Sequence, residues 1–215
     1  MSKTARGVEI NHSEVPIRLF KSDFLEFFTH ISPVAVLVIW VPVTLFFLVR
    51  AILDVTAGGA WWVVPVAFIF GVVVWTFTEY TLHRFLFHYH AKGERAQRVF
   101  FLFHGVHHAQ PQLKTRLVMP PIVSIPLALV FYGLFYLGVG QILGAPQWVA
   151  PLLSGFITGY LLYDMTHYAT HHFPMRSGYL KFIKRYHMAH HFKAPDALYG
   201  VSSPVWDYVF RTGEA

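Results

Sequence analysis

The chain has 215 residues, of which 55% are hydrophobic and only 13% charged, and its mean hydropathy is +0.46. Because a soluble domain usually carries about 25% charged residues, this composition argues against an ordinary soluble protein. The lack of cysteine excludes disulfides and thiolate metal sites. A net charge of +6 would also suit a nucleic-acid-binding protein, but basic residues mark the cytoplasmic loops of membrane proteins, and we expect no nucleic-acid partner.

Four apolar segments are long enough to cross a bilayer as helices, which takes roughly 20 residues each. They cover about residues 31–49, 61–78, 121–143 and 148–163. Pro42 and Pro126 lie within the first and third segments, where membrane helices tolerate proline. The first apolar run is too long for a cleavable signal peptide and lacks a small-residue cleavage site, so we expect it to remain as an anchor.

The basic residues are confined to one side of these four spans. Four precede the first span, six lie between the second and third, and six follow the fourth, which leaves only Arg50 of the 17 elsewhere. By the positive-inside rule, both termini and the middle segment are cytoplasmic. We therefore predict an integral, multi-pass protein of a bacterial inner membrane or the endoplasmic reticulum. The short connections 58–59 and 144–146 are typical of turns between antiparallel helices.

These features predict an all-α fold with four transmembrane helices in two hairpins and a cytoplasmic helical cap. We expect residues 1–30 to form an N-terminal cytoplasmic segment and residues 31–215 to form a single membrane domain. The sequence specifies no oligomeric state.

Histidines gather after the second and fourth spans in four clusters. Within each half, 16 residues separate the first cluster from a His-x-x-His-His motif, and this repeat indicates two similar sets of ligands. The ten residues are His83, His88, His104, His107, His108, His167, His171, His187, His190 and His191. They are enough for two metal ions with about five nitrogens each. Of the other four, His12 and His30 are expected at the surface, and His90 and His172 have no place in the repeat.

Helical spacing places most of these side chains together, because residues three and four apart share a face. His104, His107 and His108 are therefore expected on one side of a helix. His83 and His88 are five apart, roughly 140° around an ideal helix, so they either bind different metals or lie where the helix ends. Neutral imidazole suits iron, zinc, copper and nickel, so the ligand type alone does not identify the metal.

Carboxylates near the clusters are candidates for orienting the imidazoles. Glu79 lies four residues before His83, and Asp164 lies three before His167, each about one helical turn away. Both are at the ends of apolar spans, where an unpaired charge is costly. Asp196 and Asp207 are less favoured, because solvated surface roles explain them equally well.

Together these motifs resemble the fatty acid hydroxylase superfamily of membrane non-haem di-iron enzymes, and within it most closely the sphingolipid fatty acid 2-hydroxylases. The resemblance runs from about residue 70 to 212. It rests on EYTLHRFLFH at 79–88, HGVHH at 104–108, YDMTHY at 163–168, HMAHH at 187–191, GVSS at 200–203 and WD at 206–207.

The resemblance implies that the ten histidines bind two metal ions and that Tyr163 and Asp164 flank the site. Iron is expected in the active enzyme, and zinc is a possible substitute in purified protein. The substrate is expected to be a membrane lipid or acyl lipid. Eukaryotic 2-hydroxylases usually carry an N-terminal haem domain, which has no counterpart before the first span, so we expect a separate electron-donor protein.

The depth of the site bears on the reaction. Since the histidine clusters begin where the spans end, the metals should lie near the cytoplasmic interface, close to the acyl carbon next to a lipid carboxyl or amide group. This agrees with hydroxylation at C2 by dioxygen and external electrons. A sterol or carotenoid hydroxylase, or a desaturase, shares the histidine pattern. A metal transporter would place ligands inside the spans, and these contain no histidine.

Overall fold

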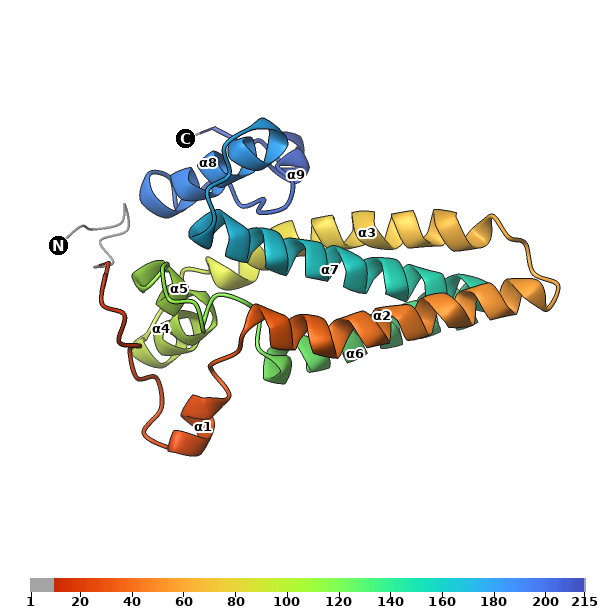
Figure 1. Cartoon of the computed structure of the whole chain (residues 1–215), viewed down its shortest axis with the longest axis horizontal. Helices are drawn as coiled ribbons and strands as arrows, with labels where there is room; N and C mark the ends of the chain where they lie inside the picture. Colours follow the sequence, from red (N-terminus) through yellow and green to blue (C-terminus); the bar gives the residue numbers. More distant parts are fainter. Residues whose placement is uncertain (1–9, 215) are drawn as a thin grey trace. The chain divides into compact units, whose positions relative to one another are not determined.

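The computed structural model describes residues 10–214, and every regular element among them is helical (Figure 1). These residues form two compact units, each assembled from separate stretches of the chain. The histidine unit takes its described residues from Met1–Ser32, Phe77–Val118 and Met165–Ala215. The span unit comprises Pro33–Thr76 and Met119–Asp164.

Long apolar helices make up the span unit. They are α2 (Pro33–Thr56), the first part of α3 (Val63–Thr81), α6 (Pro121–Leu134) with its π-helical continuation η3 (Phe135–Ile142), and the first part of α7 (Val149–His172), preceded by the 3-10 turn η4 (Pro146–Trp148). Within residues 10–214, three helices are long and apolar enough to cross a membrane: Pro33–Thr56, Val63–Phe87 and Pro121–Ile142. In the first and third, only 17% and 11% of the most apolar stretch is buried, as expected of surfaces that face lipid.

Helix α7 contains the fourth predicted segment but is not among those three. It carries polar residues such as Ser154 and Thr158, and nearly all of its first twelve residues are buried. Its Tyr160 packs edge-on against Trp40 of α2, and its Phe156 packs against Trp75 of α3. Other helices of the unit therefore cover α7, so it needs less apolar surface of its own.

Helices α3 and α7 approach each other closely in the span unit because glycines face the opposing backbone. A Cβ atom added to Gly155 would lie 1.9 Å from the carbonyl oxygen of Phe68, and one added to Gly71 would lie 2.2 Å from that of Leu152. Small residues at such contacts are typical of helix pairs in membranes.

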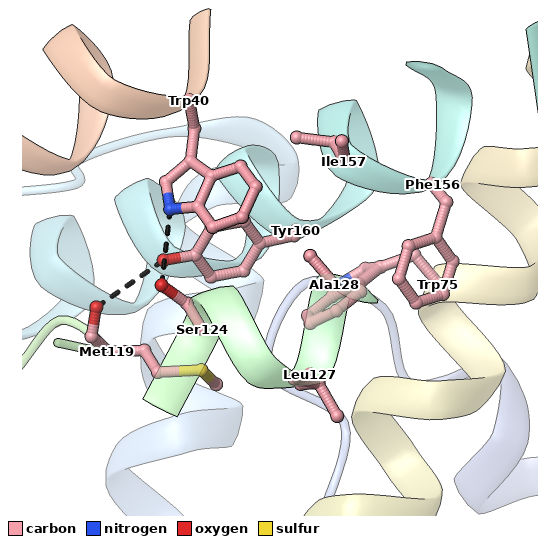
Figure 2. Close-up of a pocket in the computed structure, with 9 residues that line it drawn as sticks. All are labelled: Trp40, Trp75, Met119, Ser124, Leu127, Ala128, Phe156, Ile157 and Tyr160. Atoms are coloured by element: carbon pink, nitrogen blue, oxygen red, sulfur yellow. Dashed lines mark hydrogen bonds between the residues drawn. The ribbon is translucent and has the colours of Figure 1, made fainter. Parts of the chain in front are cut away.

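An apolar pocket lies among these helices (Figure 2). The polar atoms of Trp40 and Tyr160, which line the pocket, are hydrogen-bonded within the span unit. The Trp40 indole donates to Ser124 Oγ at 3.2 Å, and the Tyr160 hydroxyl donates to Asp164 Oδ2 at 3.1 Å. Its lining is otherwise hydrophobic, with Trp75, Leu127, Ala128, Phe156 and Ile157 among the residues that form it.

Short helices make up the rest of the histidine unit. They are α1 (Asp23–Phe27), the π-helix η1 (Leu82–Phe87), α4 (Glu94–Phe100), the π-helix η2 (Phe101–Gly105), α5 (Val106–Ala109), α8 (Gly178–Phe192) and α9 (Val205–Val209). The end of α3 and the end of α7 also belong to this unit.

The N-terminal segment is hydrogen-bonded along the stretch that follows His107 and His108. Its backbone N–H groups at Asn11 and Ile31 donate to the carbonyl oxygens of Ala109 and Thr115, both at 2.8 Å. The largely buried guanidinium of Arg116 binds Glu26 and donates to Thr29 Oγ1 at 3.2 Å. His30 joins this network: its Nδ1 lies 2.8 Å from Thr115 Oγ1 and its Nε2 lies 2.8 Å from Arg116. The side chain predicted to be a plain surface histidine is therefore partly enclosed.

Candidate metal centre

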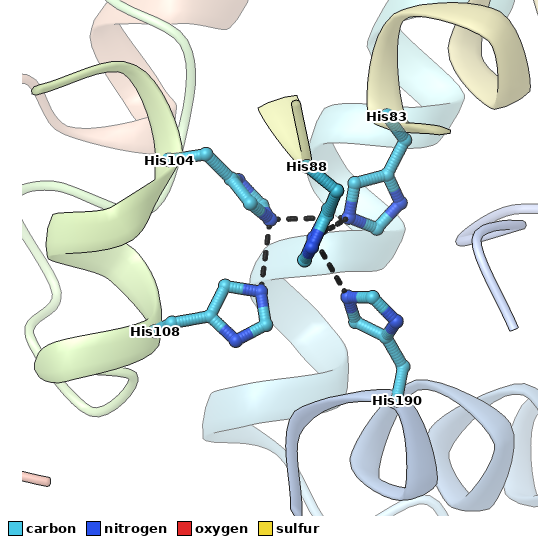
Figure 3. A group of neighbouring side chains, drawn as sticks. All are labelled: His83, His88, His104, His108 and His190. Carbon is cyan, nitrogen blue, oxygen red and sulfur yellow. Dashed lines mark hydrogen bonds between the residues drawn. The ribbon is translucent and has the colours of Figure 1, made fainter. Parts of the chain in front are cut away.

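All ten clustered histidines come together in the histidine unit, in two groups of five. In each group the candidate ligand nitrogens lie within 4.8 Å of one another, and no side chain is more than 7% exposed. The first group, shown in Figure 3, is His83, His88, His104, His108 and His190. The second group is His107, His167, His171, His187 and His191.

The two halves of the chain exchange one candidate ligand each. In both His-x-x-His-His motifs, the first and third histidines join the group built from their own half, while the middle one, His107 or His190, joins the other group. The trio at 104–108 therefore does not converge on one centre as the helical spacing predicted. An i, i+4 pair shares a centre, and the residue at i+3 points to the neighbouring one.

A π-turn explains how His83 and His88 reach the same group. The backbone N–H of His88 donates to the carbonyl oxygen of His83 at 3.0 Å, a bond between residues five apart. The wider π-turn brings positions i and i+5 to one face, which an α-helix does not. The matching pair in the second half, His167 and His171, is four residues apart and lies in a regular α-helix. That helix already places positions i and i+4 on one face.

The spacing of the imidazole nitrogens fits metal ions. In the first group, the Nε2 atom of His83 lies 3.1 Å from the Nε2 atom of His88 and 3.1 Å from that of His104. Nitrogens held about 2.1 Å from one ion lie about 3.0 Å apart at a right angle and about 3.4 Å apart at a tetrahedral angle. The observed spacing is thus short enough for these nitrogens to bind one common ion.

The second group has the same spacing. His107 Nε2 lies 3.0 Å from both His167 Nε2 and His191 Nε2, and His171 Nε2 lies 2.8 Å from His187 Nε2. Each group therefore has the donor set and the internal distances to hold one metal ion.

Backbone carbonyls fix the orientation of two ligands in the first group. The Nδ1 of His83 donates to the carbonyl oxygen of Tyr199, and the Nδ1 of His190 donates to that of Ala197 at 2.7 Å. A carbonyl only accepts, so Nδ1 carries the proton and, in neutral imidazole, the Nε2 lone pair faces the centre.

Burial disfavours the charged form of several of these histidines and so favours the neutral form that binds metal. Desolvation, followed by the charges of neighbouring histidines, lowers the pKa of His104, His107 and His187 well below the ordinary value. The pKa values of His167 and His191 are lowered for the same reasons.

The predicted carboxylates bind backbone N–H groups in the structure. Glu79 Oε1 accepts from the N–H groups of Val201 and Ser202, both at 2.7 Å. Asp164 accepts from the N–H of Met119 at 3.2 Å. Tyr163, which the sequence also singled out, packs against Trp75 within the span unit, with ring centroids 5.7 Å apart.

Sequence reasoning undervalued Asp207. This carboxylate is fully buried and accepts from the N–H groups of Tyr199 and Gly200 at 2.9 and 2.7 Å. The signal available in the sequence was the GVSS and WD pair of motifs. Asp196, by contrast, is exposed and lies 3.5 Å from the exposed His90. The ring of His172 packs against Tyr168, with centroids 4.5 Å apart, outside both groups.

The chain is similar in sequence to known fatty acid hydroxylases. A family model described as fatty acid hydroxylase matches residues 68–212. Dihydroceramide fatty acyl 2-hydroxylase FAH2 of Arabidopsis thaliana is 39% identical over 197 residues, which cover 91% of this chain and 79% of that protein. Fatty acid 2-hydroxylase of Rattus norvegicus is 36% identical over 92% of this chain and 56% of its own length.

A solved structure of similar fold is described as full-length scs7p with only its hydroxylase domain visible. It superposes with a TM-score of 0.79 at 34% identity, covering 90% of this chain and 72% of the other. The helical arrangement is therefore shared with a hydroxylase domain.

Proposed function

The chain belongs to the fatty acid hydroxylase family, and from this premise we propose that it is a membrane-bound dimetal oxygenase that hydroxylates the acyl chain of a lipid at C2. The observation that carries the proposal is the pair of buried five-histidine groups. The relatives named above favour this activity over sterol or carotenoid oxidation and over metal transport.

Iron is the proposed metal. Imidazole nitrogens suit iron among the first-row transition metals, and each group would supply five of them to one ion. Iron held by these histidines would supply reduction of dioxygen and oxidation of an unactivated C–H bond. Zinc is expected to occupy the same nitrogens when iron is absent during purification.

The surrounding protein contributes orientation and exclusion of water. The ten imidazoles are almost completely buried, so bulk water is kept from the reacting centre. The carbonyls of Ala197 and Tyr199 hold two ligands in the correct tautomer. In the overall reaction, a C–H bond, dioxygen, two electrons and two protons give a C–OH group and water. We assign the electrons to a separate donor protein.

We further propose that α2, α3, α6 and α7 all cross the membrane and that the histidine-bearing segments lie on its cytoplasmic side. The distribution of basic residues supports this orientation. His83 lies in η1, which continues α3, and His167 lies in the last turns of α7, so the histidines begin near the ends of the apolar helices. A centre at that depth lies near the first carbons of an acyl chain, which supports C2 as the position of attack.

The test is product analysis in membranes that contain the protein. We expect 2-hydroxy acyl lipids to form only with iron, dioxygen and a reductant, and His107→Ala to reduce them to background. His12→Ala is the matched control, because His12 is exposed and outside both groups, and it should leave the product unchanged. Full activity in His107→Ala would refute the site, and hydroxylation at another carbon would refute the C2 assignment.

A further inference from the structure

A single loop, residues 197–202, supports the first histidine group, and we name it the ligand-support loop. Its carbonyl groups at Ala197 and Tyr199 accept from the Nδ1 atoms of His190 and His83, as described above. The loop is tightly wound. Leu198 has a positive φ of 60°, and a Cβ atom added to Gly200 would lie 2.1 Å from the carbonyl oxygen of Ser203.

Two buried carboxylates hold the ligand-support loop in place. Asp207 accepts from Tyr199, Gly200 and, at 2.7 Å, the hydroxyl of Thr212. Glu79 accepts from the next two N–H groups along the loop, and its second oxygen accepts from the Ser202 hydroxyl. Tyr199 thus links a carboxylate to a ligand directly: its N–H donates to Asp207 while its carbonyl oxygen accepts from His83.

The second group lacks this support at three of its ligands. Among the described residues, no protein partner lies within hydrogen-bonding distance of the buried Nδ1 atoms of His171, His187 and His191. Hydrogen bonds to the outer nitrogen orient a metal-binding imidazole and make it a better donor, so the two groups differ in what determines ligand geometry.

We propose that the two metal positions are unequal and that Glu79 and Asp207 are positioning residues for the first one only. The first group, with His83 and His190 held by the ligand-support loop, binds its ion more tightly, and the second exchanges its ion more readily. This inference rests on the proposed function, since it takes both groups as metal sites. Neither carboxylate acts as a ligand; each acts through the loop.

The experiment measures Zn²⁺ affinity by competition with a chelator, using the full chain purified in detergent and stripped of metal. His171→Ala disables the second group, so that binding reports the first, and His108→Ala does the reverse. We expect tighter binding in the His171→Ala background. Adding Asp207→Asn places an amide N–H₂ among backbone donors, and should weaken Zn²⁺ binding about 10–100-fold in that background. In the His108→Ala background, the change should stay within about threefold.

Glu26→Gln is the matched control, because Glu26 is also a shielded carboxylate that accepts from backbone N–H groups, at Leu19 and Phe20, but it does not contact the ligand-support loop. It should change neither affinity. Glu79→Gln keeps the acceptor for Val201 and Ser202 and should show the same selectivity with a smaller effect, which also serves if Asp207→Asn does not fold.

The outcomes separate the inference from the proposed function. Equal affinities in the two backgrounds, or equal weakening by Asp207→Asn in both, would overturn the inference and leave the dimetal site intact. Failure of the chain to bind Zn²⁺ in either background would overturn the proposed function, and the inference with it.

Discussion

The backbone N–H of His88 donates to the carbonyl oxygen of His83 at 3.0 Å, and both side chains lie in the first histidine group. The hydrogen bond joins residues five apart, whereas in the second half of the chain a regular α-helix carries the matching histidines, His167 and His171, four apart. The two halves therefore reach the same ligand arrangement with different helices. The extra residue in the first half is accommodated by the π-turn.

Changing the length of this turn should show which separations between His83 and His88 allow both histidines to bind one metal ion. Deletion of Phe85, whose side chain is exposed, would convert the pair to the i, i+4 spacing of the second half, and we expect the protein to retain two Zn²⁺ ions. Insertion of one alanine after Phe85 would place the histidines six apart, off a common face in either helix type, and should cost one ion. The measurement is zinc per protein after dialysis. Equal zinc contents in the two variants would contradict this role for the π-turn.

Apolar length and the position of basic residues were enough to predict an all-helical membrane protein, because burial and lipid exposure act on whole segments. The repeated histidine motifs predicted that ten imidazoles meet, because the spacing of residues along a helix can be read directly from the sequence. Which five share a centre depends on how two distant segments pack, and no local spacing encodes that.

Two further features were beyond the sequence pattern. At His83 the backbone could form either the i+4 to i hydrogen bonds of an α-helix or the i+5 to i bond of a π-turn. The spacing of the histidines alone did not distinguish between these two patterns. The part played by residues 197–202 arises from backbone carbonyls, whose positions carry no signature in side-chain chemistry. Asp207 was undervalued for this reason: its partners are backbone N–H groups of Tyr199 and Gly200.

The exchange of ligands between halves predicts which double variants lose both ions. His104 and His108 belong to one group, so His104→Ala with His108→Ala should remove one ion and leave the other bound. His104→Ala with His107→Ala changes residues just as close in sequence but in different groups, and should remove both ions. Elemental analysis of the purified variants, after equilibration with limiting zinc, is the measurement. Identical zinc contents in the two double variants would show that the groups are assigned wrongly.

The stability of the metal-free protein should fall as the pH falls below about 6.5. Burial first, and then neighbouring histidine charges, lower the pKa values of His104, His107 and His187 in the folded chain. The unfolded chain has ordinary values near 6.5, so below that pH it takes up protons that the folded chain refuses. The stabilisation is present above about pH 6.5 and is lost on acidification, by up to about 1.4 kcal/mol per pH unit for each group.

Apparent unfolding temperatures of the metal-free protein in detergent, measured from pH 8 to pH 5, check this pH dependence. Replacing the exposed His12 and His90 with glutamine should leave the slope unchanged, because neither lies in the buried groups. A flat profile between pH 7 and pH 5 would show that the histidines are not held neutral by the fold.

The close contact of α3 with α7 predicts a steric effect that is independent of metal. In Gly155→Ala the new methyl group would begin 1.9 Å from the carbonyl oxygen of Phe68, which forces the helix backbones apart. Overpacking of this kind costs about 1–3 kcal/mol. Gly133→Ala in α6 is the matched control, because nothing lies within 4 Å of its added Cβ atom, and alanine favours a helix by up to about 1 kcal/mol. Unfolding by SDS in mixed micelles should therefore occur earlier for Gly155→Ala and at the same point or later for Gly133→Ala. If both variants unfold like the unmodified chain, the two helices have room between them, and the glycines do not set their separation.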